Sequence, residues 1–154
     1  TQKNAVTAGT LTSSVFAFVI SVVKQPLLGK GCENVTVPRR RIKPEDGLQA
    51  VTLFRAGDET QKATAVRYLL EELTFLRPGN SVEVRVPPFG AIQCIEGLTH
   101  RRGTPPNVVE FDADTWLALA FGELSWTDAV EAGKVHASGT RADLAELLPL
   151  MRFN

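Results

Sequence analysis

Apolar residues recur every three or four positions in two neighbouring stretches of the chain, which is typical of amphipathic helices. The stronger stretch begins at Asp58, a good N-cap with Gln61 at the position that completes a capping box, and ends at Arg77-Pro78-Gly79. Its apolar positions are Ala63, Val66, Leu69, Leu70, Leu73 and Leu76. A shorter helix should precede it, with apolar positions Leu48, Val51, Leu53 and Phe54. We therefore expect two consecutive helices that each bury one face.

Strict alternation of apolar and charged residues over 82–86 predicts a half-buried strand. Pro87 and Pro88 end this strand, because a proline cannot donate a hydrogen bond to a sheet. Three more strands are expected, the first of them buried on both faces: residues 89–95, 108–111 and 134–138. In the last of these strands, Val135 and Ala137 should face inward.

Three further helices are indicated by capping residues. The first is capped by Asp112 and stops at Gly122, with Phe111 and Trp116 at the two positions of a hydrophobic staple. Two capping boxes open the others: Ser125 with Asp128 before a helix that ends at Gly133, and Thr140 with Asp143 before a terminal helix with Leu144, Leu147 and Leu148. Because the strands cluster rather than alternate with helices, this order predicts an α+β fold with helices covering one face of a sheet.

The chain divides near residue 38. Every cap, staple and glycine stop lies in residues 39–154, which we expect to form one domain. Residues 1–38 are interpreted as an N-terminal extension outside the native fold, and one hypothesis is that the native protein starts at Val37. The apolar run in this extension, residues 11–23, is shorter than the roughly 20 residues that a membrane-spanning helix needs.

Positive and negative residues balance at 17 each among the 154 residues, but they are unevenly placed. Arg39, Arg40, Arg41 and Lys43 are bunched at the start of the domain, and the chain beyond them has 10 positive against 16 negative residues, a net charge of −6. This net negative charge disfavours binding of nucleic acid by the domain, because such binding needs positive residues that neutralise phosphates. The basic cluster could touch RNA or an anionic membrane, but a solvated start to the domain is favoured, so we expect at most transient membrane contact.

Residues suited to catalysis or metal binding are few. His100 and His136 belong to no HExxH arrangement, and the chain lacks a G-x-S-x-G nucleophile motif and a phosphate-binding glycine loop. Cys32 and Cys94 match no zinc or disulfide spacing, which favours a reducing, cytoplasmic setting. We expect a protein that is not an enzyme and that uses no metal or cofactor.

Two segments of the C-terminal half carry a resemblance to a known family. Residues 111–129 (FDADTWLALAFGELSWTDA) and 132–139 (AGKVHASG) resemble the pattern D-x-x-x-W/F-x-x-L-x-x-G-x-L-S/D-x-x-x-A followed by G-x-V-x-x-x-G of sterol carrier proteins. With residues 82–88 (VEVRVPP) and 102–110 (RGTPPNVVE), the chain is most similar to the bacterial, actinobacterial-type stand-alone branch. The resemblance covers about residues 39–150.

The resemblance implies a mixed, mostly antiparallel sheet covered by helices, with an apolar tunnel that holds a lipid. We therefore expect the protein to bind or carry a lipid, a fatty-acyl ligand or another hydrophobic small molecule. Unlike the eukaryotic carriers, the chain has few strand residues between Pro88 and Asn107 and no long apolar C-terminal helix. Two alternatives stay open: an interaction or dimerisation module with a filled core, which would suit a homodimer, and an accessory domain of an enzyme.

The wall of an apolar pocket should come from aromatic and aliphatic residues: Phe89, Ile92, Trp116, Leu119, Phe121, Leu124 and Trp126. The helix that begins after Asp112 has apolar residues on more than one face, so part of it should meet something other than the sheet. His100, Arg101 and Arg102 are weaker candidates for contacting a headgroup at the pocket mouth, since an exposed loop tip is the simpler interpretation.

Overall fold

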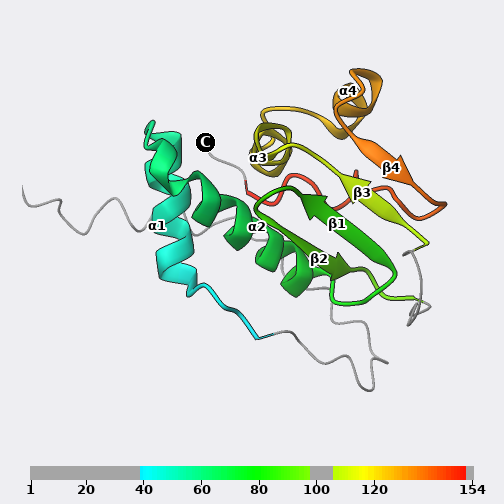
Figure 1. Ribbon diagram of the computed structural model, residues 1–154, viewed down its shortest axis with the longest axis horizontal. Coiled ribbons are helices and arrows are strands. Elements are labelled where there is room, and N and C mark those ends of the chain that lie inside the picture. Colours follow the sequence, from blue (N-terminus) through cyan, green and yellow to red (C-terminus); the bar gives the residue numbers. More distant parts are fainter. Residues whose placement is uncertain (1–38, 98–105, 152–154) are drawn as a thin grey trace, which may run out of the picture.

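The computed structural model describes residues 39–97 and 106–151 (Figure 1). The elements in chain order are helix α1 (Pro44–Arg55), the 3₁₀ turn η1 (Glu59–Gln61), helix α2 (Lys62–Leu76), strands β1 (Val82–Val86), β2 (Gly90–Cys94) and β3 (Val108–Glu110), helices α3 (Ala113–Phe121) and α4 (Trp126–Glu131), and strand β4 (His136–Ser138). This is the α+β order that the sequence predicts, up to the last strand.

The four strands form one mixed sheet in the order β2-β1-β3-β4. Strand β1 pairs antiparallel with β2, where Val84 lies opposite Ile92, and parallel with β3, where Val84 lies opposite Val109. Strand β4 pairs antiparallel with β3, with Ala137 opposite Val109. Two of the three pairings are antiparallel, so the prediction of a mixed, mostly antiparallel sheet is confirmed.

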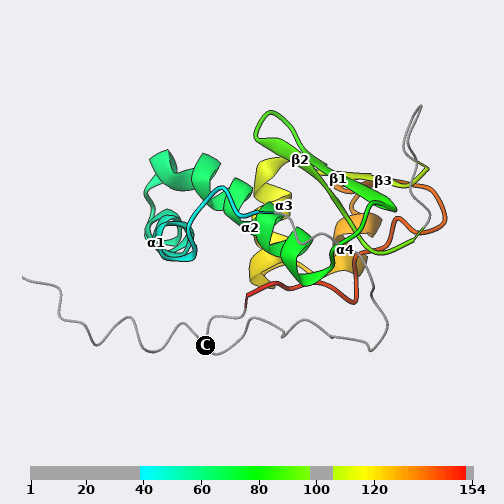
Figure 2. The same ribbon diagram turned by 90° about the horizontal axis from the view of Figure 1, so that it is seen from below.

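Helices α2, α3 and α4 lie on one side of this sheet, and α1 packs beside α2 at the end away from the strands (Figure 2). The alternation in β1 explains the arrangement, because its three valines are fully buried whereas Glu83 and Arg85 on the other face are only half-buried. The apolar face of the sheet thus carries the helices, and within residues 39–97 and 106–151 no helix covers the polar face, which we call the open face.

Helix α2 supplies much of the core through a buried face that includes Leu69, Leu70 and Leu73. Burying one such leucine side chain contributes about 1.5–3 kcal/mol. Asp58 caps the short turn η1, where its carboxylate accepts from the backbone N–H of Thr60 at 3.0 Å. The capping box expected at Gln61 does not form, since that side chain donates to the Thr60 hydroxyl instead.

Helix α3 begins and ends where the sequence predicts. The Asp112 carboxylate accepts from the backbone N–H of Thr115 at 2.8 Å and from its hydroxyl at 2.7 Å. Partial burial raises the pKa of Asp112, but these hydrogen bonds outweigh it and hold that pKa below its usual value. The staple is confirmed by the rings of Phe111 and Trp116, whose centroids lie 5.7 Å apart. Gly122 ends the helix in the left-handed conformation (φ 76°).

Two predictions about the outer strands are wrong. Strand β2 is not buried on both faces: only Cys94 is buried and Ile92 half-buried, because β2 is an edge strand with a neighbour on one side only. Ala137 is exposed rather than inward, because β4 forms the opposite edge, beyond the part of the sheet that the helices cover. Val135, just before β4, is buried as expected.

The predicted terminal helix is also wrong. The Asp143 carboxylate accepts from the N–H of Ala145 at 2.8 Å, and the N–H of Leu147 donates to the carbonyl of Leu144, but only this single turn forms. Pro149 comes next, and a proline disfavours helical geometry at the residue before it. The chain then runs along α3, where the N–H groups of residues 150 and 151 both donate to the carbonyl of Ala120 at 3.0 Å.

Candidate ligand-binding grooves

The residues predicted to wall one pocket are distributed over the core and two surface grooves. Trp116 belongs to the core: it is fully buried, stacks near Phe111 and donates its indole N–H to the carbonyl of Val66 at 3.4 Å. A neighbouring cavity between α2 and the C-terminal segment, lined in part by Leu73 and Leu147, measures only about 10 Å³. That is about the space of one water molecule, so an acyl chain would have to displace side chains to enter.

Four of the seven predicted residues do share a surface, which we name the aromatic groove. It has a volume of about 550 Å³ and lies between the end of α3, the start of α4 and the C-terminal segment. Its lining residues are Leu119, Phe121, Gly122, Leu124, Ser125, Trp126, Thr127, Ala145, Leu148 and Pro149. Within this set, Leu124 and Trp126 are half-buried and so offer apolar surface that is still open.

The turn between α3 and α4 builds the aromatic groove. Gly122 reverses the chain, and the N–H groups of Glu123 and Leu124 both donate to the carbonyl of Ala118. A side chain at Gly122 would also bring its Cβ within 3.2 Å of Pro149 on the opposite wall. The close approach of these two walls therefore depends on glycine at this position.

Helix α4 fixes the other aromatic side chain of the groove. Its N-cap is Ser125, whose hydroxyl accepts from the N–H of Asp128 at 3.1 Å and donates to the Asp128 carboxylate at 2.6 Å. The next residue, Trp126, meets the ring of Phe111 edge-on at a centroid distance of 6.2 Å. Trp126 is thereby anchored to the core on one side while its other side lines the groove.

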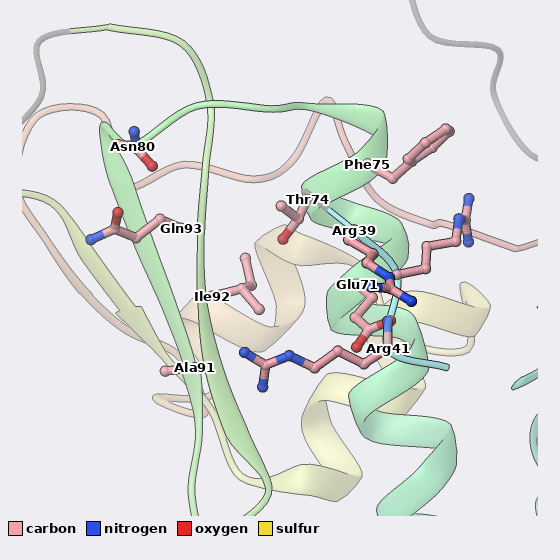
Figure 3. A pocket seen from close by; sticks show the side chains of 10 residues that line it. Arg39, Arg41, Glu71, Thr74, Phe75, Asn80, Ala91, Ile92 and Gln93 are labelled. Carbon is pink, nitrogen blue, oxygen red and sulfur yellow. The ribbon is translucent and has the colours of Figure 1, made fainter. Parts of the chain in front are cut away.

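A second surface, the arginine groove, has a volume of about 790 Å³ and lies between α2, strand β2 and the segment before α1 (Figure 3). Its lining residues are Arg39, Arg40, Arg41, Glu71, Thr74, Phe75, Asn80, Ala91, Ile92 and Gln93. The predicted residue Ile92 lies here. Phe89 lines neither groove; it is half-buried, and its carbonyl accepts from the guanidinium of Arg67 at 3.0 Å.

One ion pair and two backbone hydrogen bonds fix the arginine segment against α2. Arg40 forms an ion pair with Glu72, which is 3% exposed, and its guanidinium lies 4.2 Å from the ring centroid of Phe75. The Glu71 carboxylate accepts from the backbone N–H groups of Arg41 and the next residue at 3.0 and 3.1 Å. These contacts position the arginines although the segment has no regular secondary structure.

Reactive side chains do not gather in either groove. Burial raises the pKa of the Cys94 thiol to about 12, so that thiol stays protonated and poorly nucleophilic near neutral pH. His136 is exposed on β4, and no group of three metal-ligating side chains occurs in residues 39–97 or 106–151.

His100, Arg101 and Arg102 lie outside the described residues, as do residues 1–38. Within the described part of the chain, every helix is too short or too polar to cross a bilayer.

Comparison with known proteins gives one result that bears on these grooves. A family model described as bacterial SCP ortholog, where SCP denotes sterol carrier protein, matches residues 58–150. The matched region runs from the cap of η1 through α2, the whole sheet, α3 and α4 to the C-terminal wall of the aromatic groove. It leaves out Arg39, Arg40 and Arg41 of the arginine groove. No curated protein matches the chain.

Proposed function

Because the chain belongs to the family of bacterial SCP orthologs, we propose that it binds a lipid or fatty-acyl ligand and carries it without catalysing a reaction. The observation that carries this proposal is the aromatic groove, which lies inside the matched region and is lined mainly by apolar side chains. Its volume of about 550 Å³ falls within the range of roughly 300–1,000 Å³ that is usual for small-molecule sites.

The side chains of the groove suit an acyl chain better than a charged metabolite, although polar backbone and hydroxyl atoms share its surface. None of the described residues that line it is charged, and its hydroxyls come from Ser125, which is engaged in capping α4, and from Thr127. Each methylene group that a ligand buries there contributes about 0.8 kcal/mol, so binding strength should grow with chain length until the groove is filled. Leu124, Trp126 and Leu148 are large apolar wall residues that are only half-buried and so keep surface for such contacts.

Titration of a fluorescent fatty acid against three versions of the protein tests this proposal. The wild type should bind saturably, and Leu124→Ala should weaken binding roughly 5- to 30-fold, which corresponds to the loss of about 1–2 kcal/mol of apolar contact. Val130→Ala is the matched control, because Val130 is 45% exposed on α4 and does not line the groove. Binding that is absent, or equally weakened by both substitutions, would contradict the assignment.

A second function, an interaction or dimerisation module with a filled core, is favoured by a different observation. Trp116 is fully buried against α2 and Phe111, and the cavity beside Leu73 has room for one water at most. Native mass spectrometry separates the two proposals. A carrier should retain lipid on gentle purification, whereas an interaction module with a filled core should be detected as a ligand-free monomer or dimer.

A further inference from the structure

Among the described residues, 39–97 and 106–151, strand β2 forms an edge of the sheet with no strand beyond it. It is the first strand in the order β2-β1-β3-β4, and its residues Gly90, Ala91 and Gln93 are exposed. An edge strand presents unpaired backbone N–H and C=O groups, which proteins usually shield with charged residues, prolines or bulges. The five residues of β2, GAIQC, contain neither a charge nor a proline. The edge is therefore open to an added strand.

The hydrogen bonding of β1 shows which backbone groups of β2 have no partner in the part of the chain that the structure describes. The N–H of Glu83 donates to the carbonyl of Asn107 at 2.9 Å, and the carbonyl of Arg85 accepts from the first residue after β3 at 3.0 Å. Both β1 residues thus direct their backbone groups away from β2. In an antiparallel pair, directly opposed residues either bond each other or both point outward. Their partners, Gln93 and Ala91, therefore point their N–H and C=O groups outward from the sheet.

The arginine groove runs along this edge. Ala91 and Gln93 lie on the open face of the sheet, whereas Ile92 lies on the face that the helices cover. Because Ala91, Ile92 and Gln93 all line the groove, the groove must lie along the edge of β2, where the two faces of the sheet meet. A five-residue strand spans about 17 Å, so the β2 edge offers a short docking site for extended backbone.

The opposite wall of the groove is positively charged. Among its lining residues are three arginines and one glutamate, so the lining carries a net charge of +2. Arg40 is engaged by Glu72, but Arg39 and Arg41 are exposed, and no ion pair to either is found within residues 39–97 and 106–151. The guanidinium of Arg41 extends across the groove toward β2 (Figure 3).

We propose that the arginine groove binds an extended, acidic segment of another protein, which adds to the edge of β2 as a strand and pairs its carboxylates with Arg39 and Arg41. Backbone pairing and charge complementarity each contribute to such recognition. This site is separate from the aromatic groove and does not depend on lipid binding.

Other occupants match the groove less well. A second copy that paired through its own β2 would bring no carboxylate from that strand, because β2 contains no acidic residue. The chain before Arg39 has three lysines and a single glutamate, so it is also a poor partner for the arginines. An anionic lipid headgroup would satisfy the guanidinium groups but would leave most of the free backbone groups of the edge without partners.

Fluorescence anisotropy with synthetic peptides tests the proposal on the full chain. The probe is a labelled seven-residue peptide in which glutamate alternates with valine. It should bind saturably, more weakly at high salt, and at least about tenfold more tightly than a peptide with lysine in place of glutamate. A glutamate peptide N-methylated at alternate backbone amides should lose binding at least about tenfold, because it can no longer pair with the edge.

Substitutions in the protein locate the site. Arg39→Gln and Arg41→Gln should each weaken binding about two- to fivefold, the range of exposed ion pairs. Arg55→Gln is the matched control, because Arg55 is exposed on α1 and lies outside the groove, and it should leave binding unchanged. The N-methylated peptide tests strand pairing without altering the protein, so its result does not depend on how a variant folds.

Four results would overturn the proposal. One is that the glutamate peptide does not bind. The second is that it binds equally well when N-methylated, which would leave only charge attraction. The third is that only vesicles containing phosphatidylglycerol bind with the same dependence on Arg39 and Arg41, which would assign the groove to a membrane. The fourth is a dimer in sedimentation velocity that Ala91→Pro dissociates while the peptide fails to bind, which would assign the edge to a second copy.

Discussion

Replacing Arg40 should destabilise the fold far more than replacing an ordinary surface arginine. In the native protein Arg40 pairs with Glu72, which is only 3% exposed, and it also lies over the ring of Phe75. Arg40→Ala would leave the carboxylate of Glu72 without its cation in a largely dry environment. Removing one partner of a buried ion pair typically costs about 3–5 kcal/mol, because the remaining charge is uncompensated.

The lower part of that range is expected, because the side chain of Arg40 is 25% exposed and water can reach part of the site. A loss of about 3 kcal/mol should lower the melting temperature by roughly 10 °C for a chain of this length. Urea denaturation followed by circular dichroism at 222 nm measures the change directly. Arg55→Ala is the control: its 3.7 Å contact with Glu123 joins two well-exposed side chains, and its guanidinium lies 5.6 Å from the ring centroid of Phe121. Exposed contacts of these kinds contribute about 1 kcal/mol or less each, which is still well below the loss expected for Arg40.

A double substitution separates the ion pair from the general loss of a long side chain. Replacing both Arg40 and Glu72 by methionine removes the two charges and keeps the apolar volume, so it should cost less than Arg40→Ala alone. The reasoning is refuted if Arg40→Ala is no more destabilising than Arg55→Ala. It is also refuted if the double variant is less stable than Arg40→Ala.

Three shorter predictions concern the cap of α3, the buried thiol and the domain boundary. Asp112→Ala should cost about 1 kcal/mol in denaturation experiments, because it removes the N-cap acceptor for Thr115. Hydrogen bonds lower the pKa of Asp112 in the folded state, so the stability that its carboxylate contributes is fully present above the unfolded pKa of about 3.9. That stability is lost as the pH falls through the lower folded pKa, and the difference in unfolding free energy between Asp112→Ala and the wild type should shrink over the same range. A difference that stays constant with pH would contradict this. In a Cys32→Ser variant, Cys94 should react with iodoacetamide at pH 8 only after unfolding, because burial raises its pKa to about 12; rapid labelling of the native protein, followed by mass spectrometry, would contradict the buried position. A version that starts at Arg39 should melt cooperatively by calorimetry, and an insoluble or molten product would mean that residues 1–38 contribute to the core.

Local signals account for most of the fold that the sequence predicts. Asp112 and Ser125 cap the helices they were expected to cap, Gly122 ends α3, and the alternation of residues 82–86 identifies β1 and its buried face. Each of these depends on hydrogen bonds or side-chain directions within a few residues. The terminal helix failed for a related reason: Asp143, the second residue of the predicted capping box, caps a single turn. The path of the chain after that turn is decided by Pro149 and by contacts with α3.

The edge position of β2 could not be predicted in the same way. An apolar run with little charge fits a strand buried on both faces as well as an edge strand, and only the strand order distinguishes them. That order depends on pairing between segments that lie far apart in the sequence. Ile92 consequently faces a groove at the surface instead of an internal pocket.

The two grooves differ in the same way: one joins residues that are close in sequence, and the other joins residues that are far apart. Leu119, Phe121, Leu124 and Trp126 share the aromatic groove because a single turn joins α3 to α4, so proximity in sequence was enough to group them. Trp116 lies on the same helix but faces the core, which only the packing of α2 decides. The arginine groove joins residues 39–41 to β2 across about fifty positions. The sequence shows a cluster of arginines and an uncharged strand, but nothing in it indicates that the two lie side by side.

Lipid binding in the aromatic groove can be measured most directly by quenching tryptophan fluorescence with dibromostearic acid, because bromine quenches only at short range. Trp126 lines the groove, whereas Trp116, the other tryptophan, is fully buried in the core. Titration should quench the wild type saturably, and Trp126→Phe, which keeps only Trp116, should lose most of that quenching. Absence of saturable quenching, or equal quenching of both proteins, would contradict a lipid site in the groove.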